Sequence, residues 1–135
     1  PLYLLIAALI FRAVAIEFRS KMHSRVWRST WDFLFFVASM SIGLGVGMAL
    51  GNLVEGIPLD ENHNYIGRLV MTFIRPYPLL VGILTLSLFM MHGIIYLVMK
   101  TEGKLQEKLI EWIRPSMIFF IIAYAVTTMV TLIYQ

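Results

Sequence analysis

The sequence predicts an all-α fold: an integral membrane helical bundle with four transmembrane helices. Of the 135 residues, 59% are hydrophobic and only 14% are charged, whereas about 25% are charged in an ordinary soluble domain. A soluble chain of this length could not bury so much apolar surface in one core, but a lipid bilayer accepts it. The apolar residues also gather into four long runs that are separated by polar segments.

These four runs are the expected spans of a single membrane domain over residues 1–135. Their approximate limits are 1–16, 33–54, 79–99 and 116–134. The third run, at about 1.5 Å per residue, is about 32 Å long, close to the thickness of one hydrocarbon core. Strands are not expected, because no run alternates strictly between apolar and polar residues. Since the sequence begins without Met inside an apolar run, we expect it to lack both natural ends.

Local signals predict where the helices begin and end. Ser29 and Asp32 have the spacing of a capping box before the second span. Pro76 suits the start of the third helix, and Gly103 suits a stop after it. Pro115 fits the first turn of the fourth helix, because proline is tolerated there.

The distribution of charge predicts the orientation of the chain. Segments 17–30 and 100–114 are rich in Lys and Arg, whereas segment 55–78 is mixed. The positive-inside rule therefore places 17–30 and 100–114 in the cytoplasm and 55–78 outside, in the periplasm. The net charge of +3 is thus an orientation signal, and no nucleic-acid partner is expected.

Gly43, Gly47 and Gly51 form two overlapping GxxxG patterns on one face of the second span. Small residues at this spacing let a second helix backbone approach closely. A dinucleotide-binding loop is excluded, because no strand precedes the glycines and the run is apolar throughout. We therefore predict that this face packs tightly against another helix.

Two charged residues near the cytoplasmic end of the first span are the candidate site. Arg12 lies in an apolar run, where a charge costs roughly 2.5–3.5 kcal/mol, so it either faces the protein interior or snorkels to the membrane edge. Position alone does not separate these alternatives. Glu17 follows at the membrane boundary, where a carboxyl group can pass protons inward. Position alone favours a solvated Glu17 paired with Lys21 at i+4.

No catalytic or metal site is recognisable in the sequence itself. There is no Cys, which excludes thiolate ligands and thiol catalysis. His92 is the only Asp, Glu, Lys, Arg or His residue of the third span. It could ligate haem iron or relay protons, but a lone His is more often a hydrogen-bonded packing residue, and we favour that interpretation.

Five segments in order resemble motifs of subunit II of the cytochrome bd quinol oxidases. They are FRAVAIEFR at 11–19, WRSTWD at 27–32, GNLVEGIP at 51–58, RPYPLLVG at 75–82 and KTEG at 100–103. Each motif is weak alone, but their common order makes the resemblance specific, and it covers nearly the whole chain. The corresponding region is the middle of the N-terminal half of the family's subunit.

The resemblance implies a subunit of a bacterial inner-membrane complex that oxidises quinol and reduces oxygen to water. Haem b and haem d are then bound by subunit I, and this chain, as part of subunit II, binds no cofactor. Subunit II packs against subunit I, stabilises it and contributes to a cytoplasmic proton path. The motif's acid in that path falls on Glu17. The motif's Arg falls on Arg12, as charge partner, and His92 matches no haem ligand of the family.

Two other classes of function stay open at this point. A secondary transporter also has charged residues within spans and glycine-rich helices, but internal repeats and broken helices, which are usual in transporters, are not evident here. The other alternative is a structural membrane scaffold, in which Arg12 merely snorkels.

Overall fold

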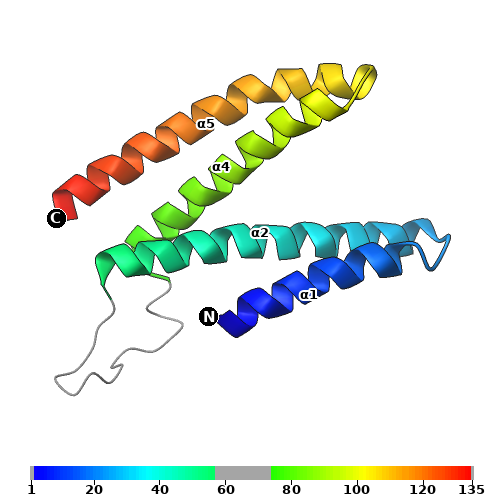
Figure 1. Cartoon of the computed structure of the whole chain (residues 1–135), viewed down its shortest axis with the longest axis horizontal. Coiled ribbons are helices and arrows are strands. Elements are labelled where there is room, and N and C mark those ends of the chain that lie inside the picture. Colours follow the sequence, from blue (N-terminus) through cyan, green and yellow to red (C-terminus); the bar gives the residue numbers. More distant parts are fainter. Residues whose placement is uncertain (1, 57–73, 135) are drawn as a thin grey trace.

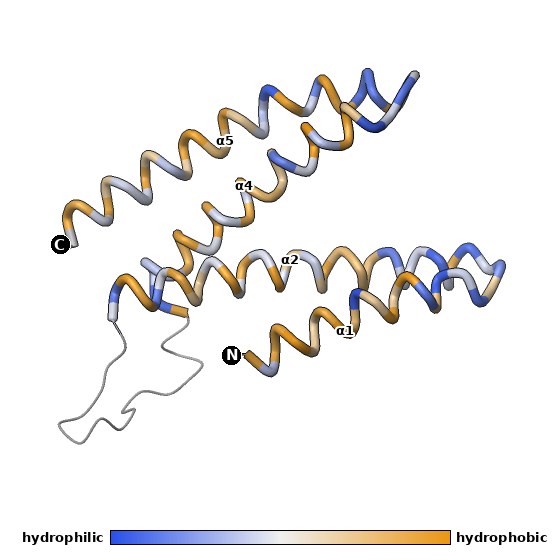
Figure 2. Tube along the Cα trace, in the orientation of Figure 1, coloured by the Kyte–Doolittle hydropathy of each residue, from blue (hydrophilic) through white to orange (hydrophobic). Residues whose placement is uncertain are grey.

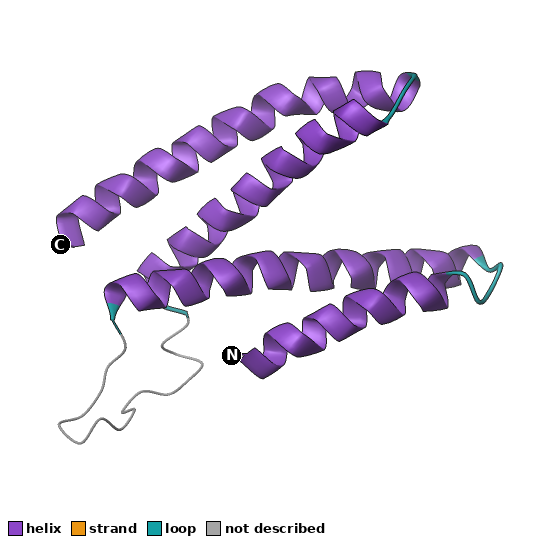
Figure 3. Ribbon diagram, in the orientation of Figure 1, coloured by secondary structure: helices purple, strands orange, loops and turns teal. Residues whose placement is uncertain are grey.

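The computed structural model describes residues 2–56 and 74–134, which are almost entirely helical (Figures 1 and 3). The helices are α1 (Leu2–Arg19), α2 (Arg25–Glu55), α4 (Pro76–Lys100) and α5 (Lys104–Tyr134). Within these two ranges there is no strand. The predicted all-α fold is therefore confirmed for the described part of the chain.

Three of these helices are long and apolar enough to cross a membrane, namely α2, α4 and α5. The first helix does not meet the same standard, because its 18 residues include Arg12, Glu17 and Arg19. Three of the four predicted spans are thus candidate membrane-spanning helices by length and composition. The crossing by α1 stays a prediction.

The helices contain the predicted spans and extend beyond them at the basic end. The structure replaces the expected loops 17–30 and 100–114 with short connections at 20–24 and 101–103. Lys, Arg, Glu and Gln are good helix formers, so the helices continue past the residues that would face hydrocarbon. Most of segment 55–78, including the end of the GNLVEGIP motif, lies outside the described residues.

Two predicted helix starts are wrong because both helices begin earlier, among polar residues. α2 begins at Arg25, after Ser24 at the N-cap position, so Ser29 lies inside the helix and does not cap it. Pro115 lies inside α5 and not in its first turn. Pro76, by contrast, occupies the start of α4 as predicted.

The turn between α4 and α5 is tight and has its own caps. The hydroxyl and the backbone N–H of Thr101 both donate to the Leu97 carbonyl, at 2.7 and 2.9 Å. Gln106, in the first turn of α5, donates to the Val98 carbonyl at 3.0 Å. Gly103 has φ +73°, a conformation that glycine adopts without strain. These bonds satisfy carbonyls that the end of α4 leaves without helical partners.

Helices that follow one another among the described residues pack together, with extensive contacts between α1 and α2, α2 and α4, and α4 and α5. Figure 1 shows the result, an open zigzag of helices. Apolar faces that no neighbour covers can lie against hydrocarbon, so the helices need not close on one another. Both short connections lie at one end, where the hydrophilic residues concentrate (Figure 2).

The α2–α4 contact is built on the predicted glycine face, whose members Gly43, Gly47 and Gly51 are all buried. A Cβ on Gly47 would lie 2.7 Å from the Cα of Gly82 and 2.6 Å from the Thr85 hydroxyl oxygen. A Cβ on Gly51 would lie 2.7 Å from the Cα of Pro78. The two backbones therefore approach more closely than any larger residue would allow, which confirms the predicted packing.

Gly47→Ala is expected to destabilise the subunit by about 1–3 kcal/mol, because its methyl group would collide with the backbone of α4. Thermal unfolding of the detergent-solubilised complex measures the effect. Gly45→Ala is the matched control, since nothing lies within 4 Å of a Cβ built there. Equal destabilisation by the two substitutions would contradict the packing described here.

Candidate functional site

The candidate site lies at the end of the α1–α2 hairpin, where two of the sequence motifs meet. The Nε of Arg19, at the end of α1, lies 2.6 Å from Oδ1 of Asp32 on α2. The indole N–H of Trp27 donates to the Phe18 carbonyl at 2.9 Å. The ring of Trp31 packs against the rings of Phe18 and Trp27, with centroids 5.3 and 5.6 Å apart. The segment 11–19 is thus joined to the segment 27–32 by an ion pair, a hydrogen bond and aromatic packing.

Glu17 is exposed and directed away from α2. Ala15, which is 1% exposed, marks the side of α1 that is covered by α2, and Glu17 is displaced from it by about 160° around the helix. Glu17 has no ion pair among the described residues. The pairing with Lys21 that position favoured is therefore not formed, because α1 ends at Arg19.

Arg12 lies against α2 by way of an aromatic ring. Its guanidinium carbon is 5.1 Å from the centroid of Phe35, within the range of a cation–π interaction. The side chain is nevertheless exposed. Arg12 and Glu17 lie about 140° apart around α1, and no ion pair joins them. Their joint role in a proton path stays a prediction.

His92 is exposed on α4, and its ring has no hydrogen bond among the described residues. The described residues thus supply no hydrogen-bond partner for His92, and its interpretation as a packing residue stays a prediction. Haem iron needs an axial ligand within a pocket that holds the macrocycle. The neighbours described here do not enclose His92, and no cluster of three metal-ligating side chains occurs in residues 2–56 and 74–134.

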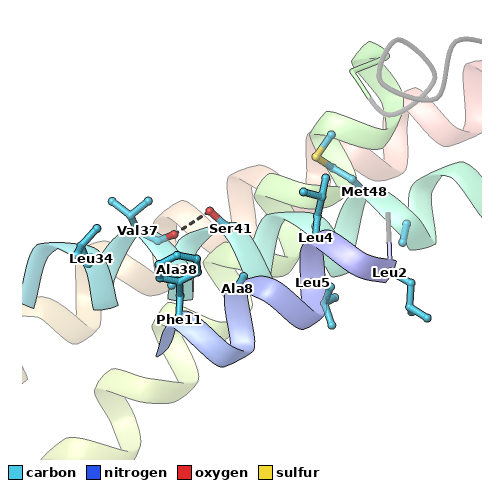
Figure 4. A pocket seen from close by; sticks show the side chains of 12 residues that line it. Leu2, Leu4, Leu5, Ala8, Phe11, Leu34, Val37, Ala38, Ser41 and Met48 are labelled. Atoms are coloured by element: carbon cyan, nitrogen blue, oxygen red, sulfur yellow. Dashed lines mark hydrogen bonds between the residues drawn. The ribbon is translucent and has the colours of Figure 1, made fainter. Parts of the chain in front are cut away.

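An apolar groove of about 690 Å³ lies between α1 and α2, away from the charged end. Its lining side chains are shown in Figure 4, and among them are Leu4, Ala8, Phe11, Leu34, Ala38, Ser41 and Met48. The Ser41 hydroxyl donates to the Val37 carbonyl at 2.8 Å, so it is already satisfied within α2. Since no titratable side chain lines the groove, it offers apolar contact and no acid–base chemistry.

A protein-family model for cytochrome bd terminal oxidase subunit II matches residues 1–134. The chain belongs to this family. The match includes all four described helices and with them the hairpin that carries Arg12 and Glu17.

Individual relatives agree with the subunit II assignment. The chain is 35% identical over 111 residues to a probable cytochrome oxidase subunit 2 of Haemophilus influenzae, covering 79% of this chain and 29% of that protein. It is 34% identical over 106 residues to the cytochrome bd-I ubiquinol oxidase subunit 2 of Escherichia coli K12, and this match covers 76% of this chain and 28% of that protein. It is 32% identical over 108 residues to the cytochrome bd ubiquinol oxidase subunit 2 of Bacillus subtilis 168, and this match covers 80% of this chain and 32% of that protein. The chain thus spans less than a third of the length of these relatives.

Two ion pairs of this subunit II chain were not predicted from its sequence. Besides Arg19–Asp32, Arg75 lies 3.5 Å from Glu55 and joins the start of α4 to the end of α2. In both pairs the acid and the base lie near the facing ends of two described helices. This arrangement of charges is visible in the sequence, but it predicts an ion pair only when the ends of the helices are known.

Trp27→Phe should loosen the last turn of α1, because phenylalanine keeps an aromatic ring but cannot donate to the Phe18 carbonyl. Faster amide hydrogen exchange is expected at residues 18–21 of the subunit, measured by mass spectrometry. Trp112→Phe is the matched control, since Trp112 is 55% exposed on α5 and far along the chain from this turn. Unchanged exchange at residues 18–21 would show that the indole bond does not hold the turn.

Proposed function

We propose that this chain is part of the haem-free subunit II of a bd-type quinol:oxygen oxidoreductase in a bacterial inner membrane. The family match carries the proposal, and two relatives are named as subunit 2 of a ubiquinol oxidase. In this proposal the haems and the quinol reaction belong to subunit I. The chain supports that subunit through its apolar helices, which also contact the bilayer, and has no redox centre of its own.

The second part of the proposal is that Glu17 takes up protons from the cytoplasmic side. Its carboxylate lies at the hydrophilic end of the molecule, faces away from α2 and has no ion pair among the described residues. An unpaired carboxylate can gain and lose a proton without breaking a salt bridge. Because it faces away from its own hairpin, it is also available to water or to a helix of a neighbouring subunit.

Arg12 completes the proposed proton path as a fixed positive charge. It is about 7.5 Å deeper along α1 than Glu17 and is held against the Phe35 ring. In this role Arg12 balances charge for the path without a direct contact with Glu17.

The other two classes of function differ from this proposal in what Glu17 does. A secondary transporter is disfavoured by membership of the oxidase family. A purely structural scaffold has the same fold, and its Glu17 would be a solvated surface residue. Substitution of Glu17 separates the scaffold from the proton path.

Glu17→Gln in the complete oxidase complex is expected to lower oxygen-reduction turnover by about tenfold or more, the scale of losing one proton-transferring group. The pH profile of turnover should change, while the apparent KM for quinol should not. Turnover is measured with an oxygen electrode over a range of pH.

Glu102→Gln is the control for this experiment, because it removes an exposed carboxylate at the same end of the molecule, in the α4–α5 connection. Turnover and pH profile should stay unchanged in this variant. If Glu17→Gln also left both unchanged, the proton role would be refuted.

The proposed orientation predicts which side of the membrane reaches each connection. Residues 1–135 contain no Cys, so Ser24→Cys, Lys104→Cys and Ile74→Cys each introduce a single thiol into this region. A membrane-impermeant maleimide should label positions 24 and 104 only in inverted vesicles, and position 74 only in right-side-out vesicles. The unsubstituted complex controls for thiols elsewhere in the subunit. The reverse labelling pattern would overturn the orientation.

A further inference from the structure

We propose that Asp32, Arg19 and Trp27 are positioning residues for Glu17, which they hold in its direction away from α2. This inference rests on the proposed proton role of Glu17. It assigns a function to the contact between the segments 11–19 and 27–32, which the sequence motifs alone do not explain.

The anchored atoms lie directly next to Glu17 in the chain. Phe18 is held through its carbonyl by Trp27 at 2.9 Å and through its ring by Trp31. Arg19 is held by Asp32 at 2.6 Å. The two residues after Glu17 are therefore both attached to α2, and their attachment leaves little freedom for the peptide that carries Glu17.

The position of Glu17 makes these anchors necessary. Glu17 is in the last turn of α1, where carbonyl groups lack helical partners and where helices fray. Within the turn, the hydroxyl of Ser20 donates to the Glu17 carbonyl at 2.8 Å, which adds a local cap. Without the anchors on α2, the end of this helix would be free to unwind, and the carboxylate would change direction.

The Arg19–Asp32 pair is better explained by orientation than by stability. Its side chains are 57% and 53% exposed, and exposed ion pairs contribute little to folding stability. The Trp27 bond is likewise at an exposed position. These contacts act on two consecutive residues, Phe18 and Arg19. Their main effect is therefore on the direction of the last turn of α1, and their effect on the stability of the whole fold is small.

The charged groups around the hairpin end leave Glu17 without an ion pair among the described residues. α2 is the helix that packs extensively on α1, and residues 11–32 contain no acid besides Glu17 and Asp32. The basic and titratable groups of the hairpin end are Arg12, Arg19, Lys21, His23, Arg25 and Arg28. Asp32 engages Arg19, and His23 lies 3.4 Å from Arg28. Glu17 has no ion pair among the described residues, as a carboxylate that exchanges protons needs.

A double-mutant cycle in the complete oxidase complex tests this inference. Oxygen-reduction turnover is measured across pH for the unsubstituted complex, Glu17→Gln, Asp32→Asn and the double variant. Asp32→Asn should lower turnover by about threefold or more, as expected when a reacting group is misplaced, and should change the pH profile. The double variant should match Glu17→Gln alone, because Asp32 has nothing left to position. Asp32→Glu, which keeps the ion pair, should recover most of the turnover.

Controls separate positioning from damage to the protein. Glu111→Gln removes an exposed carboxylate on α5 and should leave turnover unchanged. Haem absorbance per purified complex verifies assembly. Should Asp32→Asn fail to assemble, Trp27→Phe replaces it in the same cycle, because it removes one hydrogen bond and keeps an aromatic ring.

The remaining outcomes overturn the inference in distinguishable ways. If the losses from Glu17→Gln and Asp32→Asn multiply, or if Asp32→Asn has no effect, Asp32 does not act through Glu17, and the proton role of Glu17 stands. If Glu17→Gln itself has no effect, the proposed function fails, and the positioning role fails with it.

Discussion

The close approach of α2 and α4 is the contact that the rest of this structure depends on. Lipid tails are as apolar as the helix surfaces, so hydrophobic burial does not drive these helices together, and van der Waals packing must do so. The glycine face of α2 permits that packing because it brings Gly47 against Gly82. This contact joins the α1–α2 hairpin to the α4–α5 hairpin. It sets how both hairpins lie and leaves their basic connections at one end of the molecule.

The hairpin that carries the candidate site is organised by a second kind of contact. At its basic end, α1 is attached to α2 by Arg19–Asp32 and by the bond from Trp27. Farther along α1, the helices leave an apolar groove between them. Polar attachment is thus found at the end expected to meet water, and apolar surface is found where we expect hydrocarbon. Glu17 stands at the boundary between these regions, on the side of α1 that its own hairpin leaves free.

Periodicity and composition predicted the features that depend on local chemistry. The helical class, the glycine face and Pro76 at the start of α4 follow from residue types and spacing, and the structure confirms them. The starts at Arg25 and Lys104 were missed because a helix of polar residues continues beyond hydrocarbon, so hydropathy does not mark its end. The direction of Glu17 and the Arg19–Asp32 pair depend on how α1 meets α2. The contact of Arg12 with the Phe35 ring also depends on how α1 meets α2. The spacing of residues within one helix does not predict a contact between two helices.

In the proposed function, this chain supports a haem-bearing partner subunit and supplies protons to the chemistry held there. Absorption spectra of the purified complex and of its separated subunits test whether the haems belong to the partner. We expect b-type and d-type haem bands in the complex, no haem bands in the isolated subunit that contains this chain, and altered bands in the partner once that subunit is removed. Haem bands in the isolated subunit, or partner bands that do not change when it is removed, would refute the proposed function.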